Sequence, residues 1–419
     1  MKLLYLAWRN LRYDHLKSLL SILLMALGLG LISFFMVFSG QVEKNFRDNL
    51  AGVHLVLGAK GSPLQLVLCN LYHADVPTGN ISIEDAKAFL NPGHPLLSDA
   101  VPLSLGDSYK GFRLVGTTQD FLSLYDVELA VGESYTRNLQ VVLGAEVART
   151  TGLKPGDQFN SSHGLGIDEA LAESHAHSFT VTGILEESGT VADELILCTP
   201  SSFWMVHDHG HNEDAHDHGH SHAGTSVLTK TDLLQHPEKE ITSLLLRFRS
   251  KNVQSLNMMR SINENTPLMA ASPSFELNKL FDQLGIGFEL LNSVALLILL
   301  ISALSIWFGM SIALQERKYE LALIRSIGGQ PWQVVLLLLL ESLLIGLIGF
   351  LVSALLFYSL MWLSNEYWSS DWGFGRMEMR FYSEQVRVLV LGLIVAILSV
   401  VVPIVQVLRM DIARTLSAR

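Results

Sequence analysis

Cysteine is scarce in this chain: its 419 residues include only two, Cys69 and Cys198. A disulfide framework of the kind that staples small secreted domains is therefore excluded. A single disulfide between these two cysteines is still possible, and the alternative is that both are buried, small apolar side chains. Basic residues are also few, with 29 Lys and Arg against 40 Asp and Glu, and this acidic balance argues against nucleic acid as a partner.

Three catalytic motifs are missing as well. No G-x-x-x-x-G-K-[ST] phosphate loop occurs, and Gly-Ala-Lys-Gly-Ser at 58–62 resembles one only superficially because its spacing is wrong. There is neither a G-x-S-x-G nucleophile elbow nor an H-E-x-x-H zinc-binding helix. We therefore expect a non-catalytic protein that does not hydrolyse ATP by itself.

Charge is nearly absent from four long apolar runs, at 18–42, 290–315, 342–365 and 388–408. Each run is long enough to cross a hydrocarbon core of roughly 30 Å, which needs about 20 helical residues. None shows the period-two alternation of a membrane barrel strand. The sequence therefore predicts a membrane α-helical protein whose four transmembrane segments lie within 18–42, 284–315, 333–363 and 387–409.

The segment between the first two runs, 43–283, has an ordinary globular composition. It predicts an extracytoplasmic α+β domain inserted between the first and second membrane helices. Residues 275–288 continue a helical pattern into the second membrane helix, which predicts a stalk. We expect strands at 53–57, 112–115, 139–143, 179–185, 195–198 and 244–249, and helices at 82–90, 145–151 and 253–264.

Basic residues flank the apolar runs on alternating sides, as cytoplasmic segments do under the positive-inside rule. We therefore expect a cytoplasmic interfacial helix at 1–17, a cytoplasmic loop at 316–332 and a cytoplasmic tail at 410–419, with 364–386 as a short external loop. The long first run without a cleavage site predicts an uncleaved anchor. The flanking residues are Lys2, Arg9, Arg12, Lys17, Arg317, Lys318, Arg325, Arg409, Arg414 and Arg419.

Histidine is concentrated in one segment of the insert, 206–226. Neutral imidazole suits Zn²⁺, Cu²⁺ and Ni²⁺, so this segment is predicted to bind such a cation, with Zn²⁺ first. It cannot bury a core, which predicts that it is disordered without metal. Its seven candidate ligands are His207, His209, His211, His216, His218, His220 and His222.

Two other interpretations of the histidines remain open. The segment could be a solvated loop without function, or a pH-sensing one, since imidazole titrates between about pH 5 and 8. A catalytic zinc site is not expected, because it needs fixed ligands and an open coordination position. A second, weaker cluster lies nearby, formed by His163, His175 and His177 with Glu173.

Glu341 is the one carboxylate beside an apolar run, roughly three helical turns beyond Pro331. Snorkelling or a helix contact is the simpler explanation, and a proton relay is the functional one. A lone carboxylate without an intramembrane partner is weak support for a proton-driven carrier.

A charged helix end, a glycine turn and Pro331 follow the second apolar run. They predict a compact helix–turn–helix suited to docking another protein. The stretch resembles the E-R-x-x-E-[IL]-x-x-x-[RK]-[AS]-[IL]-G pattern of the MacB/FtsX/Lol-type (type VII) ABC transporter permeases. The resemblance assigns ATPase coupling to Glu316, Arg317, Glu320, Arg325 and Gly328.

Other stretches resemble the same family. Residues 7–12 with 17–19 are similar to its interfacial helix, and 142–148 with 152–157 to its extracytoplasmic domain. Glu341 stands where the family often has Glu. The C-terminus matches at Pro403, Arg409, Asp411 and Leu416, while Ile412 replaces the usual Pro.

The resemblance implies a multi-pass permease subunit of the bacterial inner membrane, with no tightly bound cofactor. Two such subunits, identical or related, would form a dimer in the membrane lipid. This dimer would bind two separate ATPase subunits. ATP-driven closure at the coupling loop would then move the stalks and the external domain, which is mechanotransmission. The family's tasks include lipoprotein release, driving an efflux partner and activating cell-wall hydrolases. Because of the histidine segment, zinc-linked transport or envelope export is a further task that we consider for this chain.

Two functions outside this family remain as alternatives. A metal-sensing membrane receptor without an ATPase would explain the histidines, although a cytoplasmic signalling domain would normally follow its last helix. A secondary transporter would need more helices and paired charges within the membrane.

Overall fold

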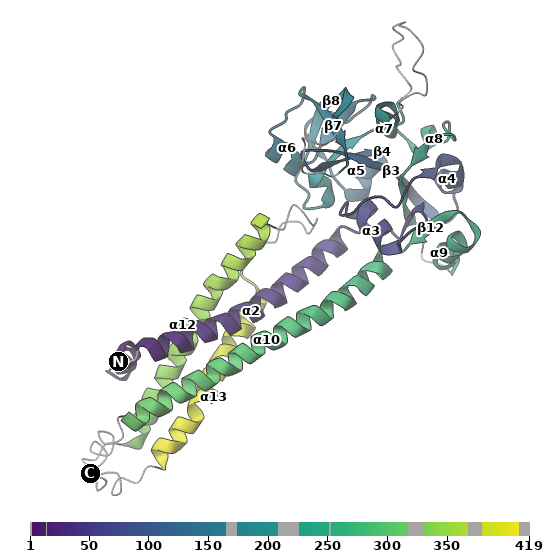
Figure 1. The fold of residues 1–419 in the computed structure, drawn as a ribbon. Helices are drawn as coiled ribbons and strands as arrows, with labels where there is room; N and C mark the ends of the chain where they lie inside the picture. Colours follow the sequence, from purple (N-terminus) through teal and green to yellow (C-terminus); the bar gives the residue numbers. More distant parts are fainter. Residues whose placement is uncertain are drawn as a thin grey trace. The chain divides into compact units, whose positions relative to one another are not determined.

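The structure is a computed structural model, and it describes residues 2–13, 15–164, 174–207, 226–250, 253–316, 330–367 and 379–409. The chain forms two compact units (Figure 1). The first unit holds the long apolar helices and comprises Met1–Val42, Asp282–Trp368 and Met377–Arg419. The second unit holds the β-sheet and comprises Glu43–Phe281 and Ser369–Arg376.

Four of the described helices are long and apolar enough to cross a membrane. The shortest has 26 residues, which exceeds the about 20 that a hydrocarbon core requires. The predicted fold class, four such helices with a sheet-rich domain between the first and second, is confirmed. The helices are α2 (His15–Asp48), α10 (Pro273–Glu316), α12 (Pro331–Tyr367) and α13 (Ser383–Leu408).

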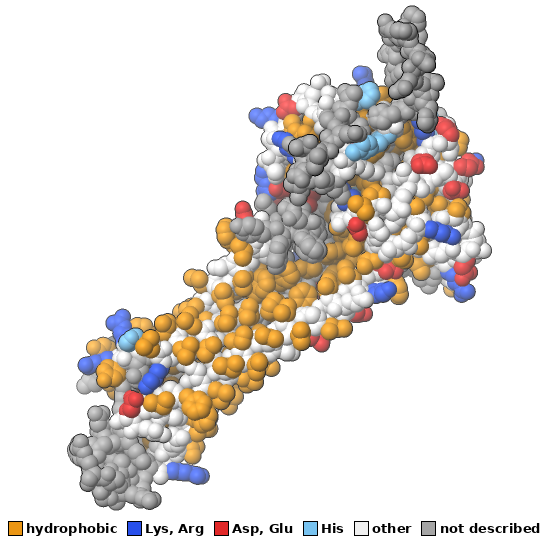
Figure 2. Space-filling model, viewed as in Figure 1, with side chains coloured by type: hydrophobic (Ala, Val, Ile, Leu, Met, Phe, Trp, Pro, Cys, Tyr) orange, Lys and Arg blue, Asp and Glu red, His pale blue; other side chains and the backbone are white. Residues whose placement is uncertain are grey.

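Large apolar side chains remain exposed along these helices. Leu290 of α10 and Leu355 of α12, for example, are 68% and 70% exposed. Figure 2 shows such side chains gathered over the long helices. An apolar surface of this extent is unfavourable in water and suits lipid.

The four helices contact one another through small and apolar residues. At Gly28 of α2 the backbones come close, because a Cβ added there would lie 3.1 Å from the backbone nitrogen of Leu299 in α10. The hydroxyl groups of Ser21 and Ser305 form a hydrogen bond of 3.0 Å between the same two helices. Lipid supplies no hydrophobic force between helices, so close approach at small residues and such hydrogen bonds stabilise the bundle.

Helix α10 is a single helix of 44 residues, about 66 Å long at 1.5 Å per residue. It begins at Pro273 within the second unit and ends at Glu316 in the first. The prediction that the helix at 275–288 continues into the second apolar run is confirmed.

The first unit also contains α1 (Lys2–Tyr13), which lies within the helix predicted at 1–17. Its Ala7 is fully buried, whereas Leu4, Tyr5 and Trp8 are exposed. The Arg12 guanidinium lies 5.3 Å from the centre of the Trp8 ring. Exposed apolar rings beside basic groups suit a helix at a membrane surface.

The second unit contains a ten-stranded mixed sheet with the order β12-β1-β11-β3-β4-β9-β6-β8-β5, in which β7 pairs with β3 and β8. The β4–β9 and β6–β8 pairs are parallel and the other pairs in this sheet are antiparallel. The strands are β1 (Leu55–Ala59), β3 (Leu97–Tyr109), β4 (Phe112–Thr117), β5 (Leu129–Gly132), β6 (Gln140–Leu143), β7 (Gln158–His163), β8 (Ser174–Leu185), β9 (Leu195–Cys198), β11 (Ser243–Phe248) and β12 (Leu268–Ala271).

Short helices and one small ladder complete the second unit. Its core includes an apolar cluster around Leu57, Leu90 and Leu246 and another around Phe179 and Phe203. The remaining elements are α3 (Pro63–Leu71), α4 (Ile83–Leu90), α5 (Asp120–Tyr125), α6 (Ala145–Thr151), η1 (Val191–Glu194), α7 (Pro200–His207), α8 (Lys230–Leu233), α9 (Val253–Asn265), and the ladder of β2 (Ile81–Ser82) and β10 (Glu240–Ile241).

The six predicted strands and three predicted helices of the insert all occur, with ends shifted by up to a few residues. The strands that were not predicted are β2, β3, β5, β7, β10 and β12. Cys69 in α3 and Cys198 in β9 are both buried and free, so they are core side chains and not a disulfide. Burial raises the pKa of the Cys69 thiol to about 11, which makes it unreactive at neutral pH.

Candidate functional site

Two adjacent strands place an acid and a histidine side by side in the second unit. Asp107 near the end of β3 is the direct antiparallel partner of His163 at the end of β7. Side chains of such partners point to the same face, with Cβ atoms about 4.5–5.5 Å apart. The register between β3 and β4 shifts between Leu105 and Ser108, which is a bulge at Asp107. A bulge of this kind re-aims the side chain that it carries.

Helix α7 supplies a second histidine, His207, at its C-terminal end. The helix is held in place because Phe203 and Val206 are buried in the apolar cluster around Phe179. The His207 ring stacks on the Phe203 ring, with centroids 5.5 Å apart. Its Nδ1 lies 2.8 Å from the backbone carbonyl oxygen of Phe203, one turn earlier. These two contacts fix the orientation of the imidazole.

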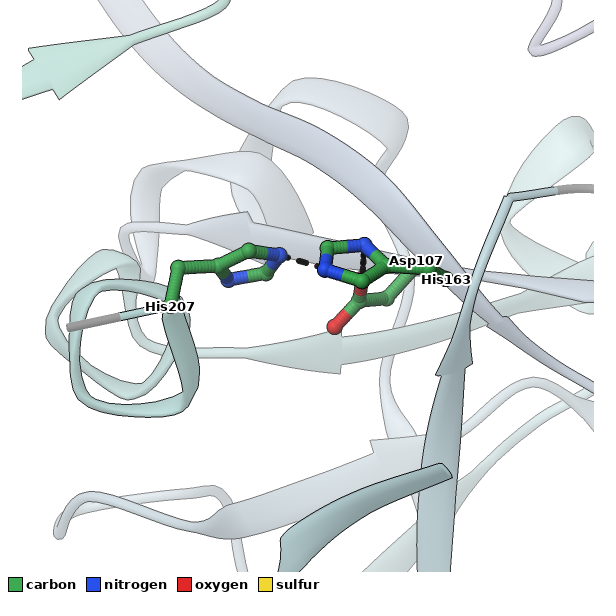
Figure 3. A group of neighbouring side chains, drawn as sticks. All are labelled: Asp107, His163 and His207. Carbon is green, nitrogen blue, oxygen red and sulfur yellow. Dashed lines mark ion pairs between the residues drawn. The ribbon is translucent and has the colours of Figure 1, made fainter. Parts of the chain in front are cut away.

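Asp107, His163 and His207 thus converge as one Asp-His-His cluster (Figure 3). The Asp107 Oδ1 atom lies 3.2 Å from Nδ1 of His163 and 3.2 Å from Nε2 of His207. One ligand atom from each of the three residues lies within 4.8 Å of the others. Within the described part of the chain, this is the one group of three or more such side chains close enough to share a metal ion.

The cluster combines a buried carboxylate with two accessible imidazoles. The Asp107 side chain is 0% exposed, whereas those of His163 and His207 are 46% and 32% exposed. Ser161 donates a hydrogen bond of 3.3 Å to Oδ2 of Asp107. The hydrogen bond with Asp107 raises the pKa of His207 above its usual value, although partial burial opposes this effect. The group can therefore attract a cation or a proton from solvent.

The structure tests part of the predicted histidine segment. His207 is not in a disordered segment as predicted, but is the last residue of the ordered helix α7, because buried Phe203 and Val206 anchor that helix. His163 belongs to β7 and joins His207, although the sequence placed them in separate clusters. His177 lies exposed in β8. Outside the described residues or side chains lie Glu173, His175, His209, His211, His216, His218, His220 and His222.

Asp107 is the member of the cluster that the sequence did not indicate. Strand β3 was not predicted, and Asp107 lies 56 positions before His163 in the chain. Only the pairing of β3 with β7 brings the two together.

The predicted coupling residues lie mostly beyond the described ranges. Glu316 is the last residue of α10 and is exposed, and its Oε1 lies 3.6 Å from Nζ of Lys17. An exposed ion pair of this length contributes little stability. Arg317, Glu320, Arg325 and Gly328 are outside the residues that the structure describes.

Glu341 of α12 accepts a hydrogen bond from the Asn10 side-chain amide of α1. The contact borders a small cavity of about 50 Å³, also lined by Lys17, Ser21 and Met310. A hydrogen bond between two helices is what the helix-contact interpretation of Glu341 requires.

Comparisons with known proteins cover both units. The MacB-like periplasmic core domain family matches residues 18–230, and the FtsX-like permease C-terminal family matches 292–412. The periplasmic region of MacB from Actinobacillus actinomycetemcomitans is 12% identical, with 56% of this chain and 97% of that chain covered and a TM-score of 0.32. The extracellular domain of the ABC-type transporter YknZ from Gram-positive bacteria is 11% identical, with 52% and 99% covered and a TM-score of 0.29.

No curated protein matches the chain. The match to the periplasmic core domain family spans half of the chain. The match to the permease family covers α12, α13 and the part of α10 from residue 292 on. On these two matches, the chain belongs to the MacB/FtsX family of ABC transporter permeases.

Proposed function

We propose that this chain is the permease subunit of an ABC transporter complex and transmits ATP-driven movement to its own sheet domain. A separate ATPase subunit would hydrolyse the ATP, and a second permease copy or homologue would complete a dimer in the membrane lipid. The bacterial inner membrane is the location that fits these partners. The task of the complex would be lipoprotein release, cell-wall hydrolase activation, or zinc-linked transport or export, and the proposal does not choose among them.

The observation that carries the proposal is the pair of family matches on one chain. Helix α10 adds a physical route, because it is one unbroken helix from Pro273 in the second unit to Glu316. A continuous helix transmits displacement along its axis better than a jointed segment does. Its last residue begins the 316–332 loop, for which we propose the docking of the ATPase.

Copurification tests this proposal. The full chain, purified in mild detergent with a nucleotide that is not hydrolysed, is expected to retain an ABC ATPase subunit, because its sequence has no phosphate loop of its own. A matched variant replaces 317–329 by a Gly-Ser segment of equal length and should lose the ATPase. Equal recovery of ATPase with both chains, or with neither, would contradict the proposed function.

The proposed orientation puts both termini and the 316–332 loop in the cytoplasm, and the sheet domain outside. A membrane-impermeant thiol reagent applied to intact spheroplasts should label Gln235→Cys and spare Ser326→Cys until the membrane is opened. Cys69 and Cys198 are buried, so the unmodified chain provides a low background. If only Ser326→Cys were labelled in closed cells, the orientation would be the opposite of the proposed one.

A metal-sensing receptor is the second candidate, and the Asp-His-His cluster is the observation that favours it. In that case zinc would alter the protein without any ATPase subunit present. The copurification experiment separates the two candidates, because a receptor of this kind would carry no ATPase.

A further inference from the structure

We infer that Asp107, His163 and His207 form a binding site for one divalent transition-metal cation of the zinc class. This inference concerns the sheet domain alone and goes beyond the proposed transport function. It also differs from the predicted binding by the histidine segment, because two of the three ligands lie on β3 and β7, outside that segment.

The first support is the spacing of the ligand atoms. Zinc binds imidazole nitrogen and carboxylate oxygen at about 2.0–2.2 Å, and a tetrahedral arrangement then places neighbouring ligand atoms about 3.3 Å apart. Oδ1 of Asp107 lies 3.2 Å from both imidazole nitrogens. Two of the three ligand-atom separations thus already suit a zinc ion, and the two imidazole nitrogens lie within 4.8 Å of each other.

The second support is the hydrogen bonding of His207. A backbone carbonyl can only accept, so Nδ1 of His207 donates its hydrogen to Phe203. In the neutral ring, Nε2 is then an unprotonated acceptor directed at the carboxylate oxygen of Asp107. Two acceptors at this distance repel each other unless a proton or a cation lies between them. A carbonyl partner on the second ring nitrogen is also what metal-bound histidines usually have.

The third support is charge and access. A buried carboxylate is costly unless positive charge or hydrogen bonds compensate it, and Asp107 is 0% exposed. A divalent cation held between the three side chains would supply such positive charge. The partial exposure of both rings gives the ion a path from solvent, and three protein ligands leave the fourth tetrahedral position for water or another donor.

The test uses the full chain in detergent, freed of metal by a chelator and titrated with zinc against a competing indicator. A background variant removes the other candidates of the segment but keeps His207. In it, Asn replaces each of His209, His211, His216, His218, His220 and His222. This background should still bind one zinc ion, and zinc should raise its melting temperature.

Three substitutions in that background decide whether the ion sits in the cluster. His163→Gln, His207→Gln and Asp107→Asn should each weaken zinc binding by about 100-fold or more, since losing even an outer partner of a ligand costs about 10–100-fold. They should also abolish the zinc-dependent rise in melting temperature. His177→Gln, an exposed histidine of β8 outside the cluster, is the matched control and should bind as the background does.

Two results would overturn the inference. One is a background variant that binds no zinc, which leaves only a proton-linked ion pair at the cluster. The other is unchanged zinc binding in the cluster variants. His163 is 46% exposed, so its Gln variant should fold even if the Asp107 variant does not, which keeps the test decisive. Copurification of the ATPase is measured on the same variants, so a failed metal site and a failed transport function are distinguished.

Discussion

Exchanging the charges of Arg317 and Glu320, as Arg317→Glu together with Glu320→Arg, is expected to uncouple the transporter while leaving the chain folded. The exchange leaves the net charge of this stretch unchanged while it reverses the charge that each position presents to a partner. Like charges brought together at an interface cost several kcal/mol, which corresponds to at least about 100-fold in affinity. ATPase turnover by the assembled complex should therefore fall to the level of the ATPase alone.

The sheet domain offers a matched control for this exchange. Glu84 and Lys87 form an exposed ion pair of 3.3 Å at the same spacing in α4. The exchange Glu84→Lys with Lys87→Glu alters charge equally, yet it should leave ATPase binding and turnover unchanged. If the 317/320 exchange also leaves both unchanged, 316–332 is not the coupling element.

The second large effect is a loss of stability in mild acid, caused by His73. This residue is half-buried in the sheet domain and has a left-handed backbone (φ 54°). Its two ring nitrogens are buried and have no hydrogen-bond partner among the described residues. Burial, and to a smaller extent the nearby positive charge of Arg113, together lower the pKa of His73 to about 3. The folded protein therefore keeps His73 neutral.

The direction of the pH effect follows from these two pKa values. The unfolded chain takes up a proton on this histidine near pH 6.5, whereas the folded chain does so only near pH 3. Between these pH values the unfolded state binds more protons, so the free energy of unfolding falls as the pH falls. At pH 5 the loss from this one residue is about 2 kcal/mol relative to neutral pH.

His73→Asn should remove this contribution. Asn does not titrate in this range and tolerates the left-handed backbone better than most residues. Thermal unfolding of the full chain in detergent at pH 7.5 and pH 5 is the measurement, with His177→Asn as an exposed control in the same domain. The difference between the two pH values should shrink in the His73 variant and persist in the control. An equal difference in all three chains would mean that His73 is not the titrating group.

The membrane architecture could be predicted because its determinants are local. A run of apolar residues excludes water wherever it lies, so 18–42 and 388–408 indicate membrane helices without any knowledge of their neighbours. The same holds for α10, where the helical pattern at 275–288 continues directly into an apolar run. The motif at 316–328 is likewise contiguous, so the resemblance to the permease family was visible in the sequence and is now supported by both family matches.

Strand β3 was not predicted because its local signals oppose a strand. It contains Pro102 and Gly106, which ordinarily disfavour a central strand, and its residues do not alternate between apolar and polar. Pairing with β11 and β4 on its two sides overrides these preferences. Strand β4 follows β3 directly, but β11 lies far away in the chain, so no local window contains that second pairing.

The sequence by itself determined the four apolar helices, the inserted mixed domain and the family, because hydropathy and contiguous motifs do not depend on folding. Only the tertiary structure decided that Asp107, His163 and His207 meet. Their meeting depends on the register of β3 against β7 and on the burial of Phe203, which anchors α7. A register that differed by one residue would turn Asp107 to the opposite face of the sheet, because strand side chains alternate with a period of two.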